Sequence, residues 1–359
     1  MSAQQEIDQP QLSERERNIL KALIREYVET GKPVGSRRLT KLDPEGMSAA
    51  TIRNVMADLE ESGFVTQPHT SAGRVPTAEG YRFYVDSLVE AGPLSRRDLE
   101  QIKRGLADET DPAELMNKTS QILSSFSSNL GFVVAPPLSS VVIKRLEFIK
   151  IASRRILVIL VSKNGLVQHR VIQTEDDWEQ TELDQAGRYL ITHFSGKTLT
   201  ETRQELLAMM SEEKALYDRM LKNVIVLGSA GLMAHEQQEQ SDSEVYFGGM
   251  SGIIEKPEMA DVKRMMGLFE AFEEKSRLVQ IISECLKKDR TGPAVTIGLE
   301  DSLPQLHDWT IISSPYRADS RVMGGLGVIG PSRMEYEKAI SLVDYVAKLV
   351  GKLISQQNF

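Results

Sequence analysis

The chain has 359 residues, 41% of them hydrophobic and 26% charged, a composition typical of a globular protein with about two or three domains. Its single cysteine, Cys285, excludes a disulfide framework and a cysteine-rich zinc site. The longest aliphatic run, residues 156–161, is too short to span a bilayer, and the polar N-terminus lacks the apolar core of a signal peptide. We therefore expect a cytoplasmic protein without a membrane segment, beginning with a disordered tail over residues 1–11.

The net charge of −8 is unfavourable for nucleic-acid binding when it is averaged over the chain, but the charge is unevenly distributed. Residues 32–53 hold five Lys or Arg against two acidic residues. Residues 141–172 hold seven against one, and residues 173–245 hold fifteen acidic residues against six basic ones. This alternation predicts separate structural units, with breaks near residues 175 and 245.

Residues 12–92 predict three helices, a hairpin and a fourth helix. Ser13 and Glu16 have the spacing of a capping box, and Gly31 ends the helix that they begin. A short second helix starts at Ser36. This order of elements, with the hairpin described below, is typical of a winged helix-turn-helix.

The third helix lies within residues 47–63 and carries a distinctive exposed face. One side is apolar at positions i, i+3, i+4 and i+7, formed by Ile52, Val55, Met56 and Leu59. The opposite face carries small or hydrogen-bonding side chains and no acid: Ala49, Thr51, Arg53 and Asn54. A helix that enters the DNA major groove needs side chains that reach base edges and no carboxylate facing phosphate. We therefore interpret this helix as DNA-contacting, the alternative being an ordinary solvated face.

Side-chain chemistry suggests a role for each polar residue near this helix. Arg53 can reach guanine or phosphate, Asn54 can read adenine, and Thr51 can contact a thymine methyl group or a phosphate. Arg37 and Arg38 lie at the start of the second helix, where they can hold the DNA backbone.

The segment FVTQPHTSAGRVPT, residues 64–77, predicts two short strands around a Ser-Ala-Gly turn. Thr77 then caps the fourth helix. Arg74 follows a glycine and precedes Val75-Pro76, an arrangement expected of a wing tip that presents a cation to a DNA groove.

The rest of the chain mixes helices and strands. Asp111 and Glu114 predict the start of a helix that ends at Gly131, and Asn164-Gly165 is a strong two-residue hairpin signal. Ser332 and Glu335 predict the cap of the last helix. Strands are expected near residues 132–136, 145–151, 155–172, 244–249, 294–298, 309–314 and 326–331, and a helix over about 258–288. The economical interpretation is an α+β domain interrupted by an acidic, helical insertion.

Several motif-like strings do not support catalysis. Gly325–Gly330 fits G-x-G-x-x-G, but it lacks a preceding strand and an acid about 20 residues further on, so we interpret it as a close-packed strand. The five histidines show no paired metal spacing, and Cys285 is expected to be a buried structural thiol. Methionine pairs such as Met209-Met210 are expected to fill the core, the alternative being an adaptable surface for a protein partner. We expect no enzyme activity, no metal and no cofactor.

The sequence closely resembles the HrcA family of heat-inducible transcription repressors over nearly the whole chain from about Leu12. The resemblance is most specific in PVGSRRL, SAATIRNVMADLEESGF and QPHTSAGRVPTAEGYRFYVD. It continues near the other end of the chain in YFGGMSG, VTIGLED, WTIISSPYR and GGLGVIGPSRMEY.

The resemblance implies an α+β multidomain protein with a winged helix-turn-helix over 12–92, a GAF-like domain over 93–175 plus 245–359, and an inserted helical dimerisation domain over 176–244. It implies a homodimer that binds double-stranded DNA at an inverted-repeat operator and represses heat-shock chaperone operons. Heat stress would inactivate the repressor, and the chaperonin would maintain its active form.

The family pattern also extends the set of candidate DNA contacts. It places the DNA-contacting helix at Ser48–Leu59 and the wing at His69–Pro76. The candidate DNA-binding residues are therefore Arg37, Arg38, Ser48, Ala49, Thr51, Arg53, Asn54, His69, Ser71 and Arg74. Val55 departs from the pattern, since many members carry glutamate there.

Two other functions fit the sequence. One is a metabolite-responsive repressor whose GAF-like domain holds a small molecule. The other is a binding or scaffold protein whose winged helix meets another protein. A steep dependence of DNA affinity on salt would argue against the scaffold.

Overall fold

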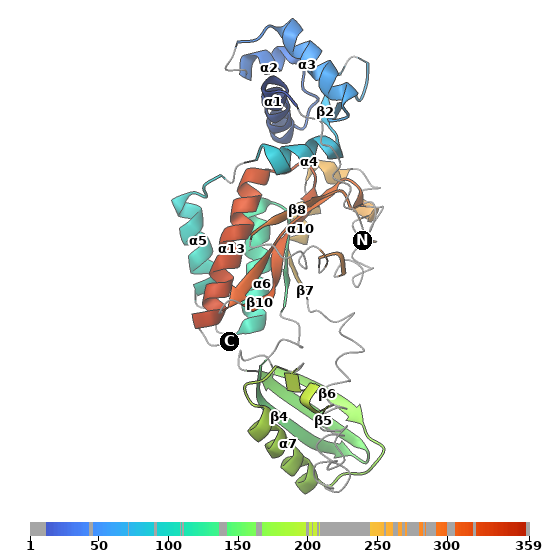
Figure 1. Ribbon diagram of the computed structural model, residues 1–359, viewed down its shortest axis with the longest axis vertical. Helices are drawn as coiled ribbons and strands as arrows, with labels where there is room; N and C mark the ends of the chain where they lie inside the picture. Colours follow the sequence, from blue (N-terminus) through green and yellow to red (C-terminus); the bar gives the residue numbers. More distant parts are fainter. Residues whose placement is uncertain are drawn as a thin grey trace.

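The computed structural model shows three units along the long axis of the molecule (Figure 1). An N-terminal unit (blue) lies at one end, a larger sheet unit lies in the middle, and a smaller sheet unit (green) lies at the other end. The described residues are 12–42, 46–70, 72–89, 92–107, 109, 111–135, 142–162, 167–198, 201–202, 204–206, 208, 245–254, 256–260, 265–267, 270, 280–282, 284, 292–299, 306–318 and 321–356. The tail expected over residues 1–11 lies outside them.

The N-terminal unit has the predicted order of three helices, a hairpin and a fourth helix. Ser13 and Glu16 form the predicted capping box, and Gly31 ends the first helix with a left-handed φ of 66°. Ser48 and Thr77 accept hydrogen bonds from backbone amides at the starts of the third and fourth helices. The elements are α1 (Glu14–Thr30), α2 (Ser36–Leu42), α3 (Ala49–Glu61), β1 (Val65–Thr66), β2 (Val75–Pro76) and α4 (Ala78–Ser87).

The central unit is built on a five-stranded antiparallel sheet in the order β7-β3-β10-β9-β8. Alternate residues of its strands face two different cores, so that Val133 and Ile312 pack with α6 and α13, whereas Phe132 and Ile311 pack on the other side with α10. Its elements are α5 (Arg96–Ala107), α6 (Pro112–Ser127), β3 (Leu130–Val134), β7 (Val245–Gly248), α10 (Met250–Ile254), η3 (Pro257–Ala260), β8 (Ala294–Ile297), β9 (Trp309–Ala318), β10 (Arg321–Pro331) and α13 (Tyr336–Gln356).

The glycine-rich string 325–330 lies inside strand β10, as its interpretation as a close-packed strand predicted. A Cβ atom at Gly327 would lie 2.1 Å from the carbonyl oxygen of Ile312, and one at Gly330 would lie 2.0 Å from the side chain of Asn129. These glycines are therefore required by close packing rather than by phosphate binding.

The third unit contains β4 (Ile143–Ala152), β5 (Arg155–Ser162), β6 (Val167–Gln173) and α7 (Gln180–Phe194). The three strands form their own antiparallel sheet, and β5 and β6 pair up to Val161 and Val167, which confirms the predicted hairpin. The turn residues Asn164 and Gly165 themselves lie outside the described residues.

Here the structure differs from the expected domain boundary, which assigned residues up to 175 to the central domain. Phe148 and Val158 share a core with Leu183 and Leu190 of α7, and this core is separate from the two that cover the central unit's sheet. The charge break at 175 therefore falls inside one compact unit, because side-chain charge follows the surface and not the core. The inserted unit begins near residue 142 and contains a sheet as well as a helix.

The last helix is capped differently from the prediction. α13 begins at Tyr336, and the hydroxyl of Ser332 donates to the carbonyl oxygen of Asp308 and accepts from Thr310 instead of capping the helix. The predicted helix over 258–288 lies largely outside the described residues, as do Cys285 and Met209-Met210. None of the helices that the structure describes is long and apolar enough to cross a membrane.

Candidate nucleic-acid interface

Helix α3 lies in the N-terminal unit, at the end of the molecule away from the central unit (Figure 1). Ile52, Met56 and Leu59 are buried, as the apolar periodicity predicted. Thr51, Arg53 and Asn54 are exposed, while Ala49 is only half-buried. The exposed alanine of the first turn is Ala50, which the sequence analysis did not nominate.

The start of α3 is capped by Ser48, and its first turn carries no acid. The Ser48 hydroxyl accepts a hydrogen bond of 3.1 Å from the amide of Thr51, and the two side-chain oxygens lie 2.9 Å apart in a further hydrogen bond. The partial positive charge of this helix start is therefore not offset by an acidic side chain within the first turn of α3, which favours an anion such as phosphate.

Helix α2 carries two neighbouring arginines that behave differently. Arg37 is exposed and makes no ion pair with any described residue. Arg38 donates a hydrogen bond of 2.8 Å from its Nε to the buried carboxylate of Glu26 on α1, and this bond raises the pKa of the Arg38 guanidinium. Arg38 therefore ties α2 to α1, and only part of its donor set is free for phosphate.

Arg74 is turned inward, contrary to the expectation that it presents a cation at a wing tip. Its Nη2 atom lies 2.7 Å from a carboxylate oxygen of Glu60 on α3, and its side chain is only 20% exposed. Its backbone exchanges two hydrogen bonds with Val34, of 2.8 and 2.9 Å. A Cβ atom at Gly73 would lie 2.3 Å from the Val34 carbonyl oxygen, so glycine is required where the hairpin approaches this loop.

The hairpin tip is organised by Gln67, which sequence reasoning missed. Its side-chain amide donates to the carbonyl oxygens of Thr70 and Ala72, both at 2.9 Å. The candidate His69 is exposed at this tip, and Ser71 lies outside the described residues. The sequence gave no signal for Gln67, which directly follows strand β1, because the carbonyl oxygens that it bonds come into place only when the turn forms.

Comparison with known proteins bears on this arrangement. The HrcA protein C-terminal domain family matches residues 113–340. The heat-inducible transcription repressor HrcA of Syntrophobacter fumaroxidans is 41% identical over 96% of this chain and 98% of its own length, and that of Geobacter sulfurreducens is 42% identical with the same coverage. The chain belongs to the HrcA family.

A solved structure of a hypothetical protein is similar to this chain with a TM-score of 0.63, at 22% sequence identity, and the match covers 97% of this chain and all of that one. That similarity shows a shared fold. The curated HrcA relatives are heat-inducible transcription repressors, and negative regulation of transcription in the heat response is accordingly the function of the family.

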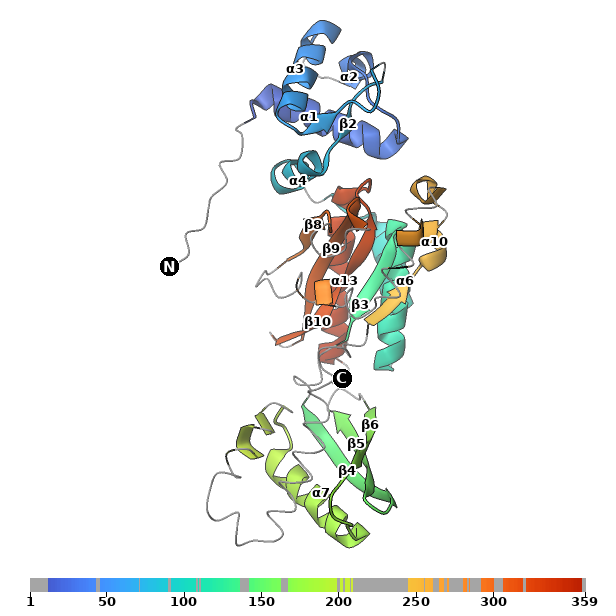
Figure 2. The same ribbon diagram turned by 90° about the vertical axis from the view of Figure 1, so that its right-hand side faces the viewer.

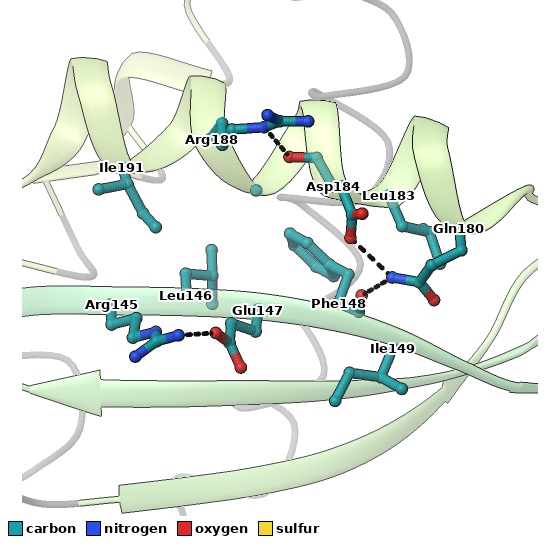
Figure 3. Close-up of a pocket in the computed structure, with 11 residues that line it drawn as sticks. Arg145, Leu146, Glu147, Phe148, Ile149, Gln180, Leu183, Asp184, Arg188 and Ile191 are labelled. Atoms are coloured by element: carbon teal, nitrogen blue, oxygen red, sulfur yellow. Dashed lines mark hydrogen bonds and ion pairs between the residues drawn. The ribbon is translucent and has the colours of Figure 1, made fainter.

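A hollow with a volume of about 510 Å³ lies between β4 and α7 (Figure 3). Its polar groups satisfy one another: Arg145 pairs with Glu147, and Gln180 donates to Asp184 and to the carbonyl oxygen of Phe148. The Gln180 side chain also accepts a hydrogen bond from the amide of Lys150. Its amide group therefore bonds both a carbonyl oxygen and an N–H at the unpaired edge of β4. This hollow therefore does not favour a ligand site, and no group of described residues could hold a metal ion.

Proposed function

We propose that this HrcA-family chain represses transcription by placing α3 in the major groove of an inverted-repeat operator. The observation that carries the proposal is the capped, acid-free start of α3, a helix that lies at the outer end of the molecule (Figure 1) and whose Thr51, Arg53 and Asn54 are exposed. The order of three helices and a hairpin supports a winged helix-turn-helix over residues 12–92.

The contacts divide into two kinds. Thr51, Arg53 and Asn54 would read base edges, since they are exposed on the face of α3 that no other described element covers. Arg37 would contact phosphate, helped by Lys41, which is exposed in the last turn of α2. Ser48, Ala49, His69 and Ser71 would lie around these contacts as the family pattern implies.

Arg38 and Arg74 would act mainly within the protein. The pair with Glu26 holds α2 against α1, and the pair with Glu60 holds the hairpin against α3. Both pairs would fix the spacing of the two elements that contact DNA.

A homodimer would place two α3 helices on half-sites related by a two-fold axis, so the operator would be palindromic. The outer face of the three-stranded sheet supports dimerisation through the inserted unit. Four large aliphatic side chains on this sheet are 38–59% exposed: Ile149, Ile151, Val167 and Val171. We propose the inserted unit from residue 142 to 244 as the dimerising domain and the central unit as the GAF-like domain.

The operators would control heat-shock chaperone genes, and the chaperonin would maintain the active repressor in the cytoplasm. A marginally stable repressor loses its folded fraction steeply on warming, so a chaperonin that refolds it would set the active pool. A repressor whose operator affinity falls on heating while its circular dichroism is unchanged would instead contain a local switch.

Selection from a random duplex library tests the function. The purified chain, at fixed salt and low temperature, should recover a palindrome whose half-site spacing reflects the dimer. If nothing is recovered, the selection is repeated with chaperonin and ATP, which refold an inactive pool. A second failure would contradict the proposal and favour a protein-binding role.

A further inference from the structure

The N-terminal unit is joined to the central unit through a dense set of contacts. Helices α1 and α4 lie over the start of α13 and the end of β8 in both ribbon views (Figures 1 and 2). Buried side chains of the two units belong to one continuous hydrophobic core. Tyr336 of α13 lies between Tyr81 and Tyr84 of α4, with ring centroids 5.8 and 6.3 Å apart.

Glu337, the second residue of α13, is the polar centre of this junction. Its Oε1 atom accepts a hydrogen bond of 3.1 Å from the Arg25 Nε, a second bond from the Arg25 Nη2, and a bond of 3.3 Å from the Tyr84 hydroxyl. One carboxylate thus engages both helices of the N-terminal unit that face the central unit.

Two arginines add bonds to backbone on either side. The guanidinium of Arg82 donates to the carbonyl oxygen of Ile297, at 3.3 Å from Nε and 3.1 Å from Nη2. Arg333 donates from Nη1 to the carbonyl oxygen of Val28, at 2.9 Å. Each unit thus donates hydrogen bonds to backbone carbonyls of the other. Together with the Glu337 contacts, these bonds hold the two units at a fixed angle.

Helix α1 connects this junction to the DNA-facing side. Arg25 pairs with Glu337 of the central unit, and the next residue, Glu26, pairs with Arg38 of α2. Helix α2 in turn packs against α3. A displacement of α1 at the junction would therefore move α2 and α3 as one body.

We propose that Glu337 is a positioning residue for operator binding: it fixes the N-terminal unit on the central unit, so that two α3 helices of a dimer match the half-site spacing. The inference rests on the proposed function. Without the Glu337 contacts, each N-terminal unit would still bind one half-site. Binding two half-sites at once would then require both N-terminal units to become fixed on their central units during binding, which costs free energy.

The test compares two substitutions on the same helix start. Glu337→Gln weakens the junction, whereas Glu335→Gln changes an exposed carboxylate that makes no hydrogen bond or ion pair with described residues. Affinities are measured for the complete palindrome and for a duplex with one half-site, alongside a melting curve. We expect Glu337→Gln to lose about tenfold in affinity for the palindrome and to bind the single half-site as the unmodified protein does. Glu335→Gln should change neither affinity.

A charge exchange separates positioning from general loss of structure. Arg25→Glu alone should weaken palindrome binding, and combining it with Glu337→Arg should recover most of the loss, because the ion pair is restored with its charges reversed. Unchanged palindrome affinity in Glu337→Gln, equal loss on both duplexes, or no recovery in the exchanged pair would overturn the inference. Failure of the unmodified protein to bind either duplex would instead contradict the proposed function and, with it, this inference.

Discussion

At the scale of single residues, Arg53 is exposed on α3, whereas Arg38 and Arg74 form ion pairs with carboxylates of the same unit. The 3.6-residue period of α3 gave the exposed positions of Arg53 and Asn54, because burial on a helix repeats locally. The partners of Arg38 and Arg74 could not be predicted, since Glu26 and Glu60 lie on other helices and meet them only in the folded unit. An arginine or lysine in a basic stretch of sequence is therefore a weaker indicator of DNA contact than one that the structure shows to be exposed.

Arg37 and Arg38 provide a matched pair for this distinction. Arg38→Ala would leave the Glu26 carboxylate, which is 7% exposed, without its hydrogen-bond partner, so we expect a loss of about 1–3 kcal/mol in the free energy of unfolding. Arg37→Ala removes an exposed side chain and should change the free energy of unfolding by less than about 0.5 kcal/mol. Urea unfolding of the two variants measures both values, and equal losses would mean that the Arg38–Glu26 pair does not support the unit.

At the scale of elements, segments with local signals were predicted well. Capping residues set the starts of α1, α3, α4 and α6, and the two-residue turn signal located the β5–β6 hairpin. The sheet to which a strand belongs was not predictable, since pairing joins residues far apart in sequence. The hydroxyl of Ser332 illustrates the same limit, because its partners lie on β9 and the loop before it.

Strand β10 yields a prediction at this scale. Gly327→Ala would place a methyl group 2.1 Å from a backbone carbonyl of β9, which cannot move without disturbing the sheet. We expect a loss of about 1–3 kcal/mol in unfolding free energy. Gly252→Ala, where nothing lies within 4 Å, is the control and should change stability by less than about 1 kcal/mol. Similar melting temperatures for the two variants would show that close packing does not require glycine in β10.

At the scale of the whole molecule, the uneven charge predicts separate units with a break near residue 175, whereas residues on both sides of that break share one core in the structure. The structure has three units: an N-terminal unit of helices and a short hairpin, a central unit with a core on each face of its sheet, and an inserted unit with its own core. The junction around Glu337 could not be predicted, since Arg25 and Glu337 are 312 residues apart in sequence.

The proposed dimer face makes a prediction about assembly. Val171 is 44% exposed on the outer face of the inserted sheet. Val171→Asp would bury a charge in a dimer contact, and we expect the dissociation constant of the dimer to rise more than about tenfold. Thr192→Asp, on the exposed side of α7, is the control. Sedimentation that finds the Val171 variant as dimeric as the control would place the contact elsewhere.

The most direct test of α3 as the DNA-reading element compares base preference in two variants, using the palindrome recovered by selection. Arg53→Ala should cost about 1–3 kcal/mol on the operator and relax the preference at one symmetric position in each half-site. Arg37→Ala should weaken binding to all duplexes alike and lower the salt dependence by about one phosphate contact. Unchanged operator affinity and base preference in Arg53→Ala would contradict the assignment of α3.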